Sequence, residues 1–109
     1  MGRKKIVRTS DFPYHITMRS NNRDWFELPI EVVWTHSIKS LSEANEVHGA
    51  LIQAFVLMAN HYHLLIWTPN SNIDKFMYEF NKRLSLKLRQ SSNRVNRVFG
   101  GRYKWALVN

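Results

Sequence analysis

The sequence of 109 residues contains no cysteine, which excludes disulfide bonds and thiolate metal sites. No apolar run approaches the roughly 20 residues that a helix needs to cross a bilayer. No charged-then-apolar signal segment opens the chain, and no internal repeat or low-complexity segment is present. We therefore expect a protein without a membrane segment, located in the cytoplasm.

Acidic residues are scarce at both ends of the chain. Residues 1–23 carry six Lys and Arg against one acid, and residues 72–109 carry nine against two, whereas residues 24–71 carry one against five. With a net charge of +8, this segregation is typical of a surface that binds a polyanion, and nucleic acid is the usual one. The alternative is a basic protein without such a partner.

What is present fits a single folded domain over residues 1–109, with a basic N-terminal arm at residues 1–11. The hydrophobic fraction is 44% and the aromatic fraction 13%, as in globular proteins. Alternating and three- to four-residue apolar spacings predict strands and helices in the order strand, helix, strand, strand, helix, strand. The strands are expected at Tyr14–Arg19, Leu51–Met58, His61–Trp67 and Arg102–Val108, and the helices over residues 29–48 and from Ile73 through Leu88, with a polar loop from Gln90 to Arg97.

This order predicts an α+β, ferredoxin-like βαββαβ fold, an antiparallel sheet with two helices on one face. Right-handed crossovers place the first and third strands in the centre and leave the other face open. The first helix is expected to bury its apolar positions, which are Val33, Trp34, Ile38, Leu41, Ala44 and Val47. Alternation assigns Tyr14, Ile16 and Met18 to the helix-covered face. The open face then holds His15, Thr17, Arg19, His61 and His63.

His61 and His63 form the one constellation with a clear claim on chemistry. Residues two apart on a strand lie about 6.5–7 Å from each other on one face, so two imidazoles can converge on one divalent ion. Such a pair with oxygen donors and water suits a Lewis acid acting on a phosphate. The alternative is a pair of hydrogen-bonded structural histidines.

Three segments together resemble a known family. Tyr14–Arg23, the hairpin Phe55–Leu65 and Phe99–Lys104 are similar to successive landmarks of the single-tyrosine HUH transposases, especially the REP-associated tyrosine transposases. The hairpin is the most specific of these segments, although Ala59 stands where family members commonly have proline. The resemblance covers most of residues 12–108.

The resemblance implies cleavage and rejoining of single-stranded or hairpin DNA through a phosphotyrosine intermediate. It implies that His61 and His63 hold a divalent metal ion, Mg²⁺ or Mn²⁺. In the family the nucleophilic tyrosine lies on a helix after the last strand, so we expect it beyond Asn109. The four tyrosines of the chain do not match that position, and we assign none as catalytic: Tyr14, Tyr62, Tyr78 and Tyr103.

Cationic residues near the open face and on the second helix are candidate DNA contacts: Arg19, Arg23, Arg83, Lys87, Arg102 and Lys104. The resemblance also implies a possible homodimer joined through an edge strand. A non-catalytic DNA-binding module with structural histidines remains the main alternative to the transposase. A small RNA-binding or regulatory domain is disfavoured, because the strands lack the exposed aromatic pairs that stack bases.

Overall fold

The predicted strands form one antiparallel sheet in the computed structural model, which describes residues 6–21, 25–93, 97–99 and 101–109. The strands are β1 (Tyr14–Arg19), β2 (Leu51–Leu57), β3 (His61–Trp67) and β4 (Lys104–Leu107). They lie in the order β2-β3-β1-β4, so β1 and β3 are central as predicted. The α+β ferredoxin-like fold is confirmed.

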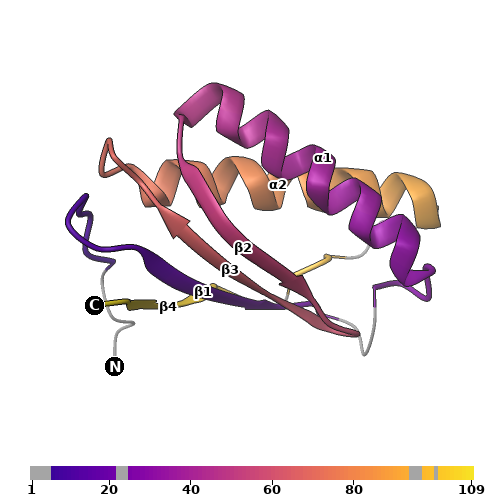
Figure 1. Ribbon diagram of the computed structural model, residues 1–109. Coiled ribbons are helices and arrows are strands. Elements are labelled where there is room, and N and C mark those ends of the chain that lie inside the picture. The colour runs from indigo at the N-terminus through magenta and orange to yellow at the C-terminus, as the bar shows by residue number, and fades with distance from the viewer. Residues whose placement is uncertain (1–5, 22–24, 94–96, 100) are drawn as a thin grey trace.

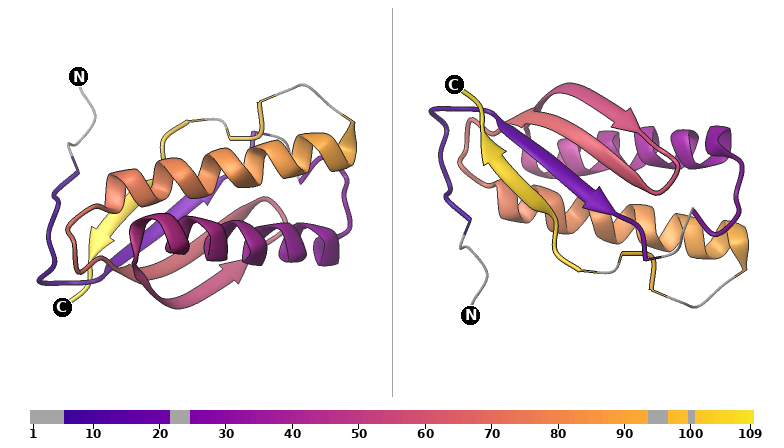
Figure 2. Two further views of the ribbon diagram at one scale, coloured as in Figure 1. Left: turned by 90° about the horizontal axis from the view of Figure 1, so that it is seen from above. Right: turned by 90° about the horizontal axis from the view of Figure 1, so that it is seen from below.

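Two helices, α1 (Ile30–His48) and α2 (Ile73–Ser92), cover one face of the sheet side by side (Figure 1). Figure 2 shows the opposite face of the sheet with no helix over it. Glycine at position 49 ends α1 with φ of 63°, a left-handed conformation that glycine adopts without a steric penalty. No helix among the described residues is both long and apolar enough to cross a bilayer.

The core lies between the sheet and the helices. Tyr14 and Ile16 of β1 are fully buried, as are Tyr62, Leu64 and Ile66 of β3. Trp25, which precedes α1, is also buried and donates from Nε1 to the carbonyl oxygen of Met58 at 2.8 Å. The period-2 alternation therefore assigns the two sheet faces correctly.

The buried stripe of α1 differs from the prediction. Trp34, Ile38 and Val47 are 46%, 41% and 56% exposed, whereas Ser37 and Ser40 are fully buried. The two serines thus occupy buried positions of α1, and Trp34 packs beside them against Phe55 of β2, with ring centroids 5.8 Å apart. The expected apolar stripe was right only for Val33, Leu41 and Ala44.

Three boundaries also differ. The fourth strand begins at Lys104 and ends at Leu107, so Arg102 precedes it. The second helix continues through Gln90 to Ser92, where a polar loop was expected, and ends at Asn93 in a left-handed conformation with φ of 59°. The third difference is that β2 ends at Leu57, one residue earlier than expected.

Candidate metal centre and nucleic-acid interface

The histidine pair lies on the open face of the sheet. His61 and His63 are half-buried, and the intervening Tyr62 is fully buried toward the helices. The register pairs Arg19 with His61 and Thr17 with His63. The structure thus brings His15, Thr17 and Arg19 of β1 onto the face that the alternation predicted.

His15 is held against His63. Its Nε2 lies 3.0 Å from His63 Nδ1, the ring centroids are 5.2 Å apart, and the ring planes differ by 11°. The distance between the ring centroids is close to the sum of the N···N distance and the two distances from each centroid to its own nitrogen. The two nitrogens therefore lie close to the line that joins the centroids. The two imidazoles are therefore nearly coplanar and meet edge to edge, which is the favourable geometry for a hydrogen bond rather than for face-to-face stacking.

His61 is held in a similar way by the turn. Its Nδ1 donates to Asn60 Oδ1 at 2.9 Å, because an amide oxygen only accepts. This assigns the proton of neutral His61 to Nδ1 and leaves a lone pair on Nε2. Thr17 Oγ1 lies 3.4 Å from His63 Nδ1. Both histidines thus engage protein groups through Nδ1, which leaves Nε2 of each as the candidate ligand atom.

These donors fit a divalent ion. The His61 and His63 ring centroids are 5.0 Å apart, and ligating histidines usually bond a protein group through their other nitrogen. Partial burial, with the neighbouring His61 and His15, lowers the pKa of His63 and favours the neutral imidazole that a metal requires. The described part of the chain has no group of three or more His, Cys, Asp or Glu able to enclose an ion. The two histidines therefore form a partial site that water and phosphate oxygens would have to complete.

The sheet contributes positive charge and no negative charge. None of the four strands contains Asp or Glu. Lys104 is exposed and pairs with Thr17 across the β1–β4 ladder, so it lies on the histidine face. Arg19 and Arg102 are also exposed. The predicted contacts Arg19, Arg102 and Lys104 thus lie on this face or at its β4 edge, whereas Arg23 falls outside the described residues.

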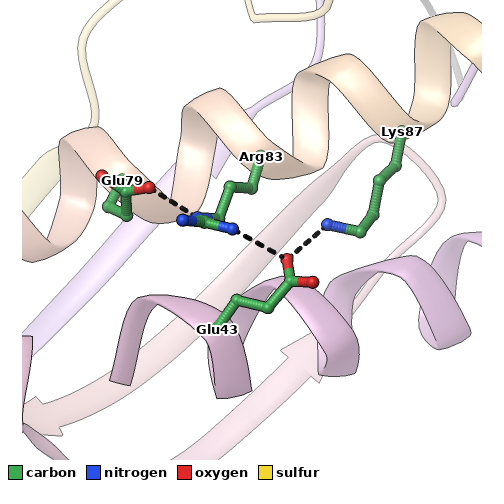
Figure 3. A network of polar contacts seen from close by, with 4 residues as sticks. All are labelled: Glu43, Glu79, Arg83 and Lys87. Carbon is green, nitrogen blue, oxygen red and sulfur yellow. Dashed lines mark hydrogen bonds and ion pairs between the residues drawn. The ribbon is translucent and has the colours of Figure 1, made fainter. Parts of the chain in front are cut away.

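Arg83 and Lys87 are placed elsewhere, in the helix layer (Figure 3). Arg83 Nε donates to Glu79 Oε2 at 2.5 Å, and Lys87 Nζ donates to Glu43 Oε1 at 2.6 Å. Arg83 also lies 3.5 Å from Glu43, and these cations lower the pKa of the Glu43 carboxyl. The structure does not bring Arg83 and Lys87 together with the histidines, and their charges are already balanced by two carboxylates.

No tyrosine stands beside the histidine pair. Tyr14 and Tyr62 are fully buried on the helix side, and burial raises the pKa of each hydroxyl. Tyr103 packs against the core, and burial raises its pKa as well. Tyr78 is exposed on α2. None of the four is positioned to attack a phosphate held at His61 and His63.

Residues 8–107 match the protein family described as Transposase IS200 like. The chain belongs to this family. A search of curated proteins finds no match to this IS200-like chain. The family assignment agrees with the resemblance in the sequence motifs.

Two solved structures have the same fold as this IS200-like chain. One is a REP-associated tyrosine transposase bound to a REP hairpin, with a TM-score of 0.79 and 13% identity over the whole chain. The other is described as a putative transposase from Deinococcus radiodurans R1, with a TM-score of 0.69 and 16% identity; this chain covers 85% of it. This chain covers 63% of the first structure, so it spans less than two thirds of that protein's length.

The sequence interpretation missed two residues of the site. Asn60 was not assigned a role, and its side chain orients His61. His15 was placed on the correct face without a role. Its direct partner in the register is Leu65, so the ring reaches His63 diagonally.

Proposed function

We propose that this chain binds single-stranded or hairpin DNA on the open face of its sheet and holds Mg²⁺ or Mn²⁺ through His61 and His63. The observation that carries the proposal is the histidine pair with both Nδ1 atoms engaged, on a sheet without acidic residues. The hairpin in the related transposase structure supports DNA as the partner. The cytoplasm fits such a role, and a homodimer through the edge strands β2 and β4 stays a prediction.

The residues of the chain have distinct roles in this proposal. Asn60 fixes the ring of His61, and His15 fixes the ring of His63. Thr17 also contacts the ring of His63. Arg19 and Lys104 contact phosphates, which positions the DNA without reading its sequence. A bound ion would supply polarisation of the scissile phosphate.

Strand cleavage would also need a tyrosine. Its oxygen bonds to phosphorus, its proton leaves, and the bond to the 3′-oxygen breaks, giving a 5′-phosphotyrosine and a 3′-hydroxyl. Because none of the four tyrosines lies beside the histidines, we infer that this group comes from polypeptide other than these 109 residues. If the isolated chain forms a covalent adduct with single-stranded DNA, this inference is wrong.

The metal site is tested by titrating the protein with Mn²⁺ and following the histidine resonances by NMR. The signals of His61 and His63 should broaden first, and either His61→Ala or His63→Ala should weaken binding strongly. His48→Ala, which removes an imidazole from the end of α1, is the matched control. Equal responses of all three variants and the unmodified protein would contradict the two-histidine site.

DNA binding is tested by a salt series on a hairpin. Each phosphate contact that is lost should reduce the slope of log K against log salt by about one. Lys104→Gln on the open face should do this, whereas Lys87→Gln in the helix layer should leave the slope unchanged. An affinity indifferent to salt would contradict the proposed interface.

A second candidate is a non-catalytic DNA-binding module whose histidines are structural. The absence of a suitably placed tyrosine among the four favours it. This candidate predicts DNA binding that is independent of Mn²⁺ and of His61→Ala. The transposase proposal predicts that Mn²⁺ strengthens binding and that His61→Ala removes the effect.

A further inference from the structure

Two adjoining hollows lie beside α2 and are lined in part by residues that precede β4. Figure 2 shows the described residues 97–99 and 101–103 on the side of α2 away from α1. The first has a volume of about 580 Å³ and includes Tyr78 and Lys82 in its wall. The second has a volume of about 830 Å³ and reaches Lys104 and Trp105 of β4. Both are lined by Asp74, Arg102 and Tyr103, so they adjoin, and we call the two together the α2–β4 groove.

The charge of the α2–β4 groove is mainly positive. Asp74 is the one acid among the described residues of its wall, and it forms an ion pair with Arg8 at 2.8 Å. Its cationic wall residues are Arg8, Lys82, Arg97, Arg102 and Lys104. A concave surface with several cations and one neutralised carboxylate attracts a polyanion.

An aromatic ring stands in the same wall. Tyr78 is 67% exposed, more than any other large hydrophobic residue of the described chain, and Lys82 Nζ lies 5.3 Å from its ring centroid. This cation–π contact, four residues along the helix, orients the ring and leaves most of it exposed. Exposed aromatic rings beside cations are the elements that bind unpaired bases. Bases in a duplex are stacked on one another, so such a ring selects single strands.

The groove is connected to the histidine face through Lys104. This residue lines the second hollow and pairs with Thr17, which contacts His63. Because adjacent strands are about 4.8 Å apart, β3 and β4 are separated by roughly 10 Å across β1. A DNA strand that leaves the histidines across β1 therefore reaches the groove over a short cationic path.

We propose that the α2–β4 groove binds a single-stranded segment of the DNA whose adjoining part lies at His61 and His63. Tyr78 stacks on an unpaired base, and Arg102 and Lys104 contact the phosphates on either side of the entrance. This inference rests on the proposed function, since it assumes that DNA occupies the histidine face. It adds a site for unpaired nucleotides and assigns a role to Tyr78.

The test compares labelled hairpins with and without single-stranded tails, measured by fluorescence anisotropy, with tails placed at each end in turn. Tyr78→Ala should weaken binding of a tailed hairpin roughly 5- to 100-fold and leave the blunt hairpin within about twofold. Tyr78→Phe keeps the ring and should retain the affinity. Trp34→Ala, which removes an exposed aromatic ring from α1, is the matched control and should change neither.

The outcomes separate the two proposals. If tailed hairpins bind and Tyr78→Ala behaves like Trp34→Ala, the groove assignment is wrong and the proposed function stands. Equal losses on tailed and blunt hairpins would also refute a single-strand site. If the unmodified protein binds none of these DNAs, both proposals fail. Arg102→Gln provides a second measure, because it should reduce the salt slope for tailed hairpins only.

Discussion

Replacing His15 with alanine tests whether this residue positions His63. The substitution removes the 3.0 Å contact between His15 Nε2 and His63 Nδ1 and leaves both candidate ligand atoms in place. Loss of such an outer hydrogen bond lowers metal affinity about 10- to 100-fold in other sites. His63 is half-buried, so water can replace the lost partner and no unsatisfied buried group remains. We therefore expect the lower value, about tenfold or 1.4 kcal/mol.

Calorimetric titration with Mn²⁺ at constant pH measures this effect without any dependence on DNA cleavage. His15→Gln places a polar atom near the position of Nε2 and should recover most of the affinity. His36→Ala is the matched control, because His36 bonds to Ser91 in the helix layer. Unchanged affinity in His15→Ala would refute the positioning role. A loss as large as that of His61→Ala would show that His15 is itself a ligand.

Two further predictions concern stability. Ser40 Oγ is buried without a hydrogen-bond partner among the described residues, so Ser40→Ala should raise the free energy of unfolding by about 1 kcal/mol in urea denaturation; a decrease would show that the hydroxyl has a partner. Burial, with Lys87 and Lys39, lowers the pKa of His36 below 6.5. The contribution of His36 to the free energy of unfolding is therefore complete above pH 6.5, and it is lost as the pH falls below 6.5. His36→Gln should lose less stability than the unmodified protein between pH 7.5 and 5.5, and equal losses would contradict the assignment.

The strands were predictable because their patterns are strict. Alternation in β3 allows one arrangement only, since a shift by one residue would bury both histidines and expose Tyr62. The apolar positions of α1 allow more than one stripe, because Trp34 and Ile38 lie close to Val33 and Leu41 around the helix. Which of these faces the sheet depends on the space left by neighbouring elements, and the small side chain of Ser37 fits there.

The contacts within the site could not be predicted for a related reason. Alternation gives the face of His15, but the contact with His63 depends on the register between two strands far apart in the sequence. Similarly, the cationic side of α2 does not reveal that Glu43 of α1 lies opposite Arg83 and Lys87. Spacing within one element predicts orientation, whereas partners on other elements follow from the assembled fold.

The distribution of paired charges indicates where an anion can bind. In the helix layer, Glu43 and Glu79 accept from Lys87 and Arg83, so a phosphate there would have to replace existing carboxylate contacts. On the sheet no strand carries an acid, and none of the ion pairs among the described residues involves Lys104, so a phosphate there would not have to replace a carboxylate. The overall charge of +8 does not distinguish these two faces, but the ion pairs do. DNA should therefore bind on the open face, its β4 edge and the adjoining α2–β4 groove, rather than along the side of α2 where Arg83 and Lys87 are paired with carboxylates.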